Sequence, residues 1–424
     1  MFDKVSKWFR QRYSNTVNSI AFYPALIAIG FLVLSYAALL LDFSDIGKNI
    51  KQNWDFISLQ DASTARSIAT TIAAGILSLT VFSFSMVMIL LNQAASNMSN
   101  RILDSMIGNR FQQAVLGFYI GTIVYALFLL STIRDIDSGI YIPALSIYLL
   151  ILLTVIDIFL FIYFLHYITQ SVKYQTIIER LHRETRNALE HCDRSNPEED
   201  DSEIRFPDLS GKEIKLKVGN YFQGFDEKSL VHFCEENDLL ISFPYTIGTY
   251  LLAGSTYMVV QSNEEITSEK IDTLKVLVDL HAGQPIKKNP YYGFEQLTEV
   301  ALKALSPGIN DPGTAVLSLH VLADLLTYQQ EFHPRTVLRD SKGQVRIVAR
   351  RPSFTALIEN FLLPIWDYGK NDRVLRQEMH RMLEQLVTAL NKVEDQVPVV
   401  KLLELVKQAV RQNSLNSLSY SRPD

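Results

Sequence analysis

Four uninterrupted apolar stretches occupy the first 168 residues of this 424-residue chain, and no stretch of comparable length follows them. They cover residues 21–41, 68–91, 114–133 and 140–166. Each is at or above the roughly 20 residues that a helix needs to cross the hydrocarbon core of a bilayer. The pattern predicts a membrane protein, mainly α-helical, with a four-helix transmembrane domain over residues 21–168.

The distribution of Lys and Arg predicts an orientation, because short loops rich in these residues stay in the cytoplasm. Basic residues precede the first stretch, separate the second from the third and follow the fourth: Lys4, Lys7, Arg10, Arg12, Arg101, Arg110, Lys173, Arg180, Arg183 and Arg186. The basic N-terminus of residues 1–20 and the C-terminus are therefore both expected in the cytoplasm. The first stretch is too long for the apolar region of a signal peptide, so we expect it to remain as an anchor.

The pattern after the fourth stretch predicts a stalk, two domains and a tail. Residues 169–203 start as a charged helix that continues the fourth span, and they end in an acidic linker that contains proline. Short alternating runs over 204–284 indicate a small α/β domain that is rich in strands. Amphipathic periodicity over 285–412 indicates a helical domain with a hairpin at 337–348. Residues 413–424 are expected to be a disordered tail.

Individual elements of these two domains can be placed by their capping residues and periodicity. Asp226 is expected to cap a helix that ends near residue 236. Strands are expected at residues 214–218, 239–243, 250–260 and 275–281. Amphipathic helices are expected at residues 293–305, 312–328, 354–366, 372–391 and 395–412.

Composition and motifs exclude more functions than they suggest. The two cysteines, Cys192 and Cys234, fall on the expected cytoplasmic side and are predicted to be free thiols. His182, His191 and Cys192 do not have zinc-ligand spacing, so no metal site is predicted. The usual nucleotide-binding, hydrolase and metalloprotease motifs do not occur in the chain. We therefore expect no catalytic residue, no cofactor, no enzymatic activity and no nucleic-acid partner.

Small and hydroxyl residues recur along one face of the second apolar stretch and continue beyond it. They are Ser67, Thr71, Gly75, Ser78, Ser85, Asn92, Ser96 and Ser99. Their spacings of three, four and seven residues put them on one helical face, and Leu77, Val81, Phe84 and Met88 are expected on the opposite faces. The stripe has two interpretations: it lines a water-filled path at the centre of an oligomer, or it allows two helices to pack closely.

Two further features stand out within the membrane segments. Gly117 and Gly121 have the spacing that permits close helix contact, which is a structural role. Asp157 lies near the middle of the fourth stretch, where an ionised carboxylate is costly. It either takes part in proton or cation handling, or stays neutral and bonds to Thr154 or to a neighbouring tyrosine.

One string in the C-terminal part could be either a turn or a binding site. Residues 306–312 read Ser-Pro-Gly-Ile-Asn-Asp-Pro, in which Pro307 and Gly308 end one helix, while Asp311 caps the next and Pro312 suits its first position. A helix start beside Ser306, Asn310 and Thr314 could also hold an anion or a carboxylate. The turn is the simpler explanation.

The chain resembles the bacterial integral membrane proteins grouped as DUF2254, a domain of unknown function. The matching strings include Gln113 to Gly117, Ile162 to His166, Asn289 to Phe294 and Ala304 to Pro312, and they spread over nearly the whole chain. Gly313 stands where similar proteins are expected to carry a bulkier residue. The resemblance implies a multi-pass protein of the bacterial inner (plasma) membrane, with the four spans, the β-rich domain and the helical end in this order. It implies no activity.

Two functional hypotheses therefore remain. The first is a homo-oligomeric channel-like or transport protein, in which the second span lines a path for ions or small molecules and the C-terminal domains assemble or gate it. The second is a membrane-anchored ligand-sensing or regulatory scaffold protein, whose C-terminal domains bind a small molecule or a protein partner.

Overall fold

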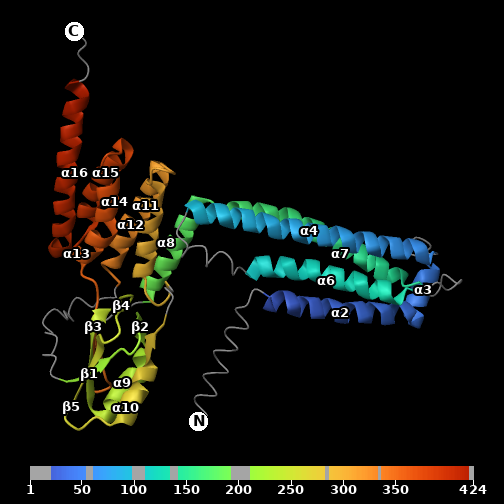
Figure 1. The fold of residues 1–424 in the computed structure, drawn as a ribbon, viewed down its shortest axis with the longest axis horizontal. Helices are drawn as coiled ribbons and strands as arrows, with labels where there is room; N and C mark the ends of the chain where they lie inside the picture. The colour runs from blue at the N-terminus through green and yellow to red at the C-terminus, as the bar shows by residue number, and fades with distance from the viewer. Residues whose placement is uncertain are drawn as a thin grey trace. The chain divides into compact units, whose positions relative to one another are not determined.

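The structure is a computed structural model that describes residues 21–53, 61–97, 110–133, 142–191, 211–281, 286–332 and 336–419 (Figure 1). Within these ranges, the side chains of residues 48, 51–53, 94–97 and 412–419 are not described. The chain divides into two compact units, Met1–Lys173 and Tyr174–Asp424, which we call the membrane unit and the C-terminal unit.

The membrane unit contains four helices that are long and apolar enough to span a bilayer. These are α2 (Phe22–Phe43), α4 (Ala62–Asn97), α6 (Arg110–Thr132) and α7 (Ala144–Ser171), together with the short α3 (Asp45–Asn53). Helix α4 starts six residues before the apolar stretch does, because the carboxylate of Asp61 accepts the backbone N–H groups of Ser63 (3.0 Å) and Thr64 (3.0 Å). The prediction of four transmembrane helices is confirmed.

Helix α6 is the most enclosed of the four, and α2 packs closely against it at two glycines. A Cβ atom on Gly121 would come within 2.6 Å of the Phe31 ring, and one on Gly117 within 2.7 Å of the Ile27 side chain. Tyr125 of α6 is fully buried in the same core. The absence of side chains at the two glycines therefore lets the helices approach each other.

The carboxylate of Asp42, at the end of α2, caps the start of α7. It accepts the backbone N–H of Leu145 at 3.1 Å, the N–H of Ser146 at 2.7 Å and the Ser146 hydroxyl at 2.5 Å. Asp42 is completely buried. An acidic group at a helix N-terminus satisfies free N–H groups and is favoured by the helix dipole, so this contact joins the ends of two membrane helices.

The C-terminal unit begins with α8 (Tyr174–Glu190), which differs from the expected stalk over residues 169–203. The fourth span does not continue as one helix, because α7 ends at Ser171 and the chain leaves helical geometry at Lys173. Helix α8 is amphipathic and buries Ile177, Leu181 and other apolar residues within the C-terminal unit. Because one side of α8 is apolar, the helix packs against other elements of the C-terminal unit instead of being surrounded by solvent.

Two small sheets form the β-rich part of the C-terminal unit. The five-stranded sheet has the order β1 (Lys212–Lys215), β5 (Thr256–Ser262), β3 (Leu239–Thr246), β8 (Val345–Arg350) and β7 (Val337–Arg339). The three-stranded sheet has the order β4 (Tyr250–Leu251), β2 (Asn220–Phe225) and β6 (Val278–Leu280). The helices α9 (Glu227–Asn237) and α10 (Ser268–Leu277) accompany them, so residues 275–277, expected in a strand, are helical.

The predicted hairpin does not belong to a separate helical domain. Strand β8 pairs in parallel with β3, with Ile241 opposite Ile347 and Ser242 opposite Val348. The apolar residues of β8 complete the core that β3 and β5 begin. The expected domain boundary at residues 284 and 285 therefore does not separate the sheet from the helices, because the sheet takes strands from both sides of it.

Helices dominate the rest of the C-terminal unit. They are α11 (Tyr291–Ala304), α12 (Pro312–Gln329), α13 (Phe354–Leu357), the π-helical turn η4 (Ile358–Leu362), α14 (Leu363–Gly369), α15 (Arg373–Ala389) and α16 (Val393–Ser419). The expected helix over 354–366 contains the π turn just before Pro364, whose missing N–H interrupts the α-helical bonding. Helix α16 extends through residues 413–419, where a disordered tail was expected, and residues 420–424 lie outside the described part.

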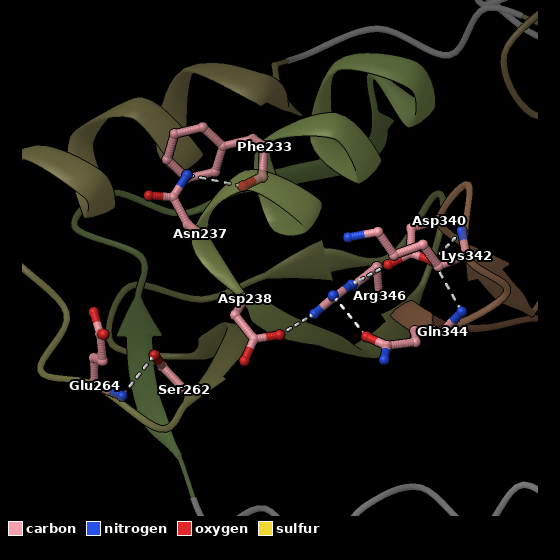
Figure 2. A network of polar contacts seen from close by, with 9 residues as sticks. All are labelled: Phe233, Asn237, Asp238, Ser262, Glu264, Asp340, Lys342, Gln344 and Arg346. Atoms are coloured by element: carbon pink, nitrogen blue, oxygen red, sulfur yellow. Dashed lines mark hydrogen bonds and ion pairs between the residues drawn. The ribbon is translucent and has the colours of Figure 1, made fainter.

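A buried arginine fixes the β7–β8 hairpin to the end of α9 (Figure 2). Arg346 donates through Nε to Asp340 at 2.7 Å and through Nη1 to Asp238 at 2.7 Å. The Asp340 carboxylate also accepts the backbone N–H groups of Lys342 and Gln344, each at 2.9 Å. One carboxylate thus organises both the arginine and the hairpin turn.

The Asp340 carboxylate should make the stability of this unit depend on acid. Burial alone raises the pKa of Asp340, but the Arg346 guanidinium and the two N–H groups outweigh it and lower the pKa below the ordinary 3.8. A lowered folded-state pKa contributes stability above the unfolded-state value, and this contribution is lost as the pH falls further. We expect Asp340→Asn to reduce the unfolding free energy near pH 6 and to have a progressively smaller effect below pH 3.8.

Denaturant unfolding across this pH range measures the effect. Asp238→Asn is the matched control, because Asp238 contacts the same guanidinium but its side chain is 66% exposed. It should change stability less than Asp340→Asn. Equal losses for the two variants at every pH would contradict the assignment.

Candidate functional site

The polar stripe of α4 faces away from the other helices of its own membrane unit. Ser67, Thr71, Gly75, Ser78, Ser85 and Asn92 are all exposed. The hydroxyl groups of Ser78 and Ser85 donate to the carbonyls of Ala74 and Val81, each at 2.9 Å. A Cβ atom on Gly75 would meet nothing within 4 Å. Within the described part of the unit, the small residues of the stripe therefore bring no second helix close.

The opposite side of α4 is the side that packs. Ala65, Ala69, Ile76 and Ser83 are buried, and they pack into the cores formed with α6 and α7. The residues expected on the opposite faces, Leu77, Val81, Phe84 and Met88, are exposed instead and flank the stripe. Their position opposite the stripe was wrongly expected, because the helical period brings Ala65, Ala69, Ile76 and Ser83 to that side. Their exposure leaves the four large side chains free to contact lipid, which they were expected to suit.

The C-terminal end of the stripe lies partly outside the described residues. The side chain of Ser96 is not described, and Ser99 lies among residues 98–109, outside the described residues. The exposed face that can be described thus runs from Ser67 to Asn92. It presents hydroxyl oxygens and one amide beside exposed apolar side chains such as Leu77, Val81 and Phe84.

Asp157 is completely buried near the midpoint of α7, and neither of its carboxylate oxygens has a hydrogen-bond partner. Thr154 is not its partner, because the Thr154 hydroxyl donates to the carbonyl of Leu150 at 2.8 Å. The group next to Asp157 is instead the hydroxyl of Thr122 on α6, and Tyr119 of the same helix is within range of the Asp157 charge. A carboxylate that α6 and α7 enclose in this way faces the interior of the bundle and not lipid.

Sequence reasoning missed the three hydroxyl residues of this region, Ser83, Tyr119 and Thr122. Ser83 lies beside the Tyr119 hydroxyl, and all three side chains are buried. None of their hydroxyl groups makes a hydrogen bond of normal geometry. One indication of this region was present in the sequence: Ser83 does not lie on the helical face that Ser78 and Ser85 share.

The string at residues 306–314 forms a turn between α11 and α12 that largely satisfies its own polar groups. The Asp311 carboxylate accepts the Thr314 N–H at 3.1 Å and the Thr314 hydroxyl at 2.6 Å. The N–H groups of Asn310 and Asp311 donate to the carbonyls of Ser306 and Ala304, each at 2.8 Å. Asn310 takes a left-handed conformation with φ of 47°, which asparagine tolerates well.

The remaining residues of this turn follow from the same arrangement. Pro312 occupies the start of α12, where its missing N–H costs nothing. Pro307 and Gly308 are exposed, and a Cβ atom on Gly308 would meet no atom within 4 Å. The turn thus has few free N–H groups with which to hold an anion.

The string at residues 289–294 is buried along its whole length and links helices to the sheets. Asn289 accepts the Tyr291 N–H at 3.1 Å and donates to the Ile247 carbonyl at 3.2 Å. Tyr292 donates to Gln223 of β2 at 3.3 Å. Gly293 lies directly against Thr185 of α8. These contacts assign the string to the core that holds the C-terminal unit together.

The titratable groups of the described residues do not form an obvious catalytic or metal centre. In that part of the chain, no three His, Cys, Asp or Glu side chains gather as metal ligands. Burial raises the pKa of the Cys234 thiol to about 12, which keeps it protonated and unreactive. Cys192 lies outside the described residues. Chemistry by a thiolate therefore has no support at Cys234.

Comparisons with known proteins give a family but no activity. The model of the family described as predicted membrane protein (DUF2254) matches residues 17–385. An uncharacterized protein of Mycobacterium tuberculosis is 24% identical over 361 residues, covering 82% of this chain and 68% of the relative. An uncharacterized protein of Mycobacterium bovis is 23% identical with the same coverage. No solved structure matches the chain.

Proposed function

We propose that this chain, which belongs to the DUF2254 family of predicted membrane proteins, forms a homo-oligomeric, channel-like or transport assembly with α4 lining its path. The observation that carries the proposal is the exposure of the polar stripe of α4, from Ser67 to Asn92, on the side away from α6 and α7. A face with hydroxyls and an amide is poorly suited to lipid tails. It is better suited to water and to the same face of other copies.

A single membrane unit cannot enclose such a path. The space between its helices is filled by large buried side chains such as Tyr119, Tyr125 and Leu129. A path along the stripe therefore requires several α4 helices around a common axis. The open space at Gly75 would let neighbouring α4 helices come close at that level.

The hydroxyl groups of the stripe are suited to contact with ions or small polar solutes. Ser78 and Ser85 donate their protons to their own helix backbone. The lone pairs of their oxygens then remain directed away from the unit, where they can accept hydrogen bonds from water or contact a cation. A narrow stripe of such oxygens could replace part of the hydration shell of a passing ion without placing a fixed charge in the path.

The C-terminal unit would assemble or gate the path from the cytoplasm. This orientation rests on the basic residues that precede the first span and follow the fourth, including Arg180, Arg183 and Arg186 in α8. The broken geometry between α7 and α8 supports a gating role, because a two-residue connection can bend while both helices keep their packing.

Leucine substitutions in the stripe test the proposal by flux. We expect the double variant Ser78→Leu and Ser85→Leu to reduce ion or small-solute flux into liposomes at least tenfold, because it replaces two path-lining hydroxyls with bulky apolar groups. Ser131→Leu is the matched control. Ser131 is also an exposed membrane serine bonded to its own backbone, but it lies on α6.

Flux of several ions and small solutes should be measured with equal amounts of folded protein in the vesicles. The control should conduct like the unchanged protein, and cross-linking should give one oligomer size for all variants. If the double variant and the unchanged protein give the same flux for every solute, α4 does not line the path.

The alternative, a membrane-anchored ligand sensor, has less support from the described residues. Its predicted binding site was the turn at residues 306–314, where Asp311 and the backbone already occupy the polar groups. The Asn310→Ala variant would discriminate the two functions. Loss of a saturable ligand response in this variant, with unchanged flux, would favour the sensor.

A further inference from the structure

The hydroxyl groups around Asp157 behave differently from other hydroxyl groups of the membrane helices. Several serine and threonine side chains of these helices donate to a carbonyl of their own helix, as Ser78, Thr80 and Thr154 do. Others donate to a carboxylate at a helix start, as Ser146 does to Asp42. Ser83 and Thr122 are buried among protein atoms, yet neither makes a hydrogen bond of normal geometry. Hydroxyl groups in an apolar interior normally use the nearest backbone acceptor. Thr122 lies beside the Asp157 carboxylate and Ser83 beside Tyr119, so the oxygens of both hydroxyl groups are available to another group.

The oxygens come from three helices and meet at mid-span. Ser83 belongs to α4, Tyr119 and Thr122 to α6, and Asp157 to α7. Ser83 is next to Tyr119, Thr122 is next to Asp157, and Tyr119 is within range of the Asp157 charge. Together the four side chains hold five unpartnered oxygen atoms, two of them from the carboxylate. Neighbouring oxygens that make no hydrogen bond of normal geometry are available as ligands around a shared cation.

Among the residues that the structure describes, no positively charged side chain is placed beside the Asp157 carboxylate. The other charged residues of α4, α6 and α7 are Arg66 and Arg110, close to helix starts, and His166. His166 is nine residues after Asp157, roughly 13 Å along the helix. A buried carboxylate without a partner is strongly unfavourable in a bilayer, so a single positive charge must accompany it.

We propose that Asp157, Thr122, Ser83 and Tyr119 form an intramembrane binding site for one monovalent metal cation of the size of Na⁺. The carboxylate neutralises the ion, and the hydroxyl oxygens replace part of its hydration shell. One carboxylate leaves a divalent ion with an uncompensated positive charge in an apolar surrounding, which disfavours Ca²⁺ or Mg²⁺. The site lies inside one membrane unit, on the packed side of α4, and does not depend on the path proposed along the opposite face.

The test is the thermal stability of the full-length protein in detergent, with NaCl replaced by choline chloride at constant ionic strength. We expect the unfolding temperature to rise saturably with Na⁺, by about 4 °C at ten times the dissociation constant. Asp157→Asn should abolish the Na⁺ response, and Thr122→Ala should weaken it at least tenfold in apparent affinity. Thr122→Ser, which keeps the oxygen, should restore it.

Thr154→Ala is the matched control, since Thr154 is on the same helix but donates to the Leu150 carbonyl. It should keep the full Na⁺ response. Replacing Na⁺ by Li⁺, K⁺ or Rb⁺ tests the unchanged protein, so this experiment does not depend on the folding of a variant. The affinities of the four cations should follow an order that depends on ion size.

Several results would overturn the proposal. One is an unfolding temperature that is equal in choline and in every alkali cation. Another is a Na⁺ response that Asp157→Asn retains. A third is stabilisation by acid alone, which would mean that a proton and not a metal ion neutralises Asp157. Of the other side chains of the proposed site, Ser83, Tyr119 and Thr122, only Tyr119 can itself titrate. Flux through α4 is measured separately, so the two proposals can fail independently.

Discussion

Gly293→Ala is expected to lower the unfolding free energy of the C-terminal unit by about 3 kcal/mol, the upper end of the usual cost of overpacking. An added Cβ atom would lie 1.7 Å from the Thr185 hydroxyl oxygen, 2.8 Å from its Cβ and 2.9 Å from its Cγ2. Alanine is ordinarily the better residue inside a helix by about 1 kcal/mol, but that gain cannot compensate contacts of this kind. Helices α8 and α11 would have to separate.

A suppressor and a control make this result specific. Thr185→Gly removes all three clashing atoms, so the double variant should recover most of the lost stability. Gly308→Ala adds the same methyl group where no atom lies within 4 Å, and it should change stability by less than about 0.5 kcal/mol. Chemical denaturation, followed by a probe in the C-terminal unit, measures all three. If Gly293→Ala and Gly308→Ala are equally stable, α8 does not pack on α11 as described.

Asp42→Ala is expected to destabilise the membrane unit by about 3 kcal/mol, because it removes the cap of α7 and leaves buried N–H groups without acceptors. The N–H groups of Leu145 and Ser146 and the Ser146 hydroxyl all depend on this carboxylate. Water cannot readily replace it, since Asp42 is completely buried. The loss should appear as a lower unfolding temperature in detergent.

Two comparisons separate the cap from a general effect of charge. Asp42→Asn keeps one acceptor oxygen and should lose only part of the stability. Asp45→Ala removes an exposed carboxylate three residues later, in the first turn of α3, and should have little effect. Equal unfolding temperatures for Asp42→Ala and Asp45→Ala would show that the cap contributes nothing.

The elements that local chemistry decides could be predicted from the sequence. Asp226 and Asp311 cap their helices as expected, accepting the N–H groups of Ser229 and Thr314. The four spans were predictable because length and apolarity alone decide them. In each case the deciding residues are adjacent in sequence, so no knowledge of distant contacts was needed.

The features that distant residues decide could not be predicted. Strand β8 joins β3 only because their apolar faces fit in three dimensions, and nothing in the sequence near Ile347 indicates the partner. The break after Ser171 could not be predicted either, because α8 is placed by its packing within the C-terminal unit and not by the residues at the break. The neighbours of Asp157 are 74 to 35 residues away in sequence, so its surroundings became visible only when α4, α6 and α7 were placed together.

The parallel pairing of β3 with β8 also has a consequence for how the protein is made. Strand β3 leaves the ribosome about 100 residues before β8, a delay of about 5 to 20 seconds at ordinary rates of translation. During that interval one edge of β3 has no partner and can capture a strand from another nascent chain. Until β8 is made, only segments synthesised between the two strands or a chaperone can cover that edge. Closely spaced ribosomes on one messenger RNA would raise the risk of mispairing.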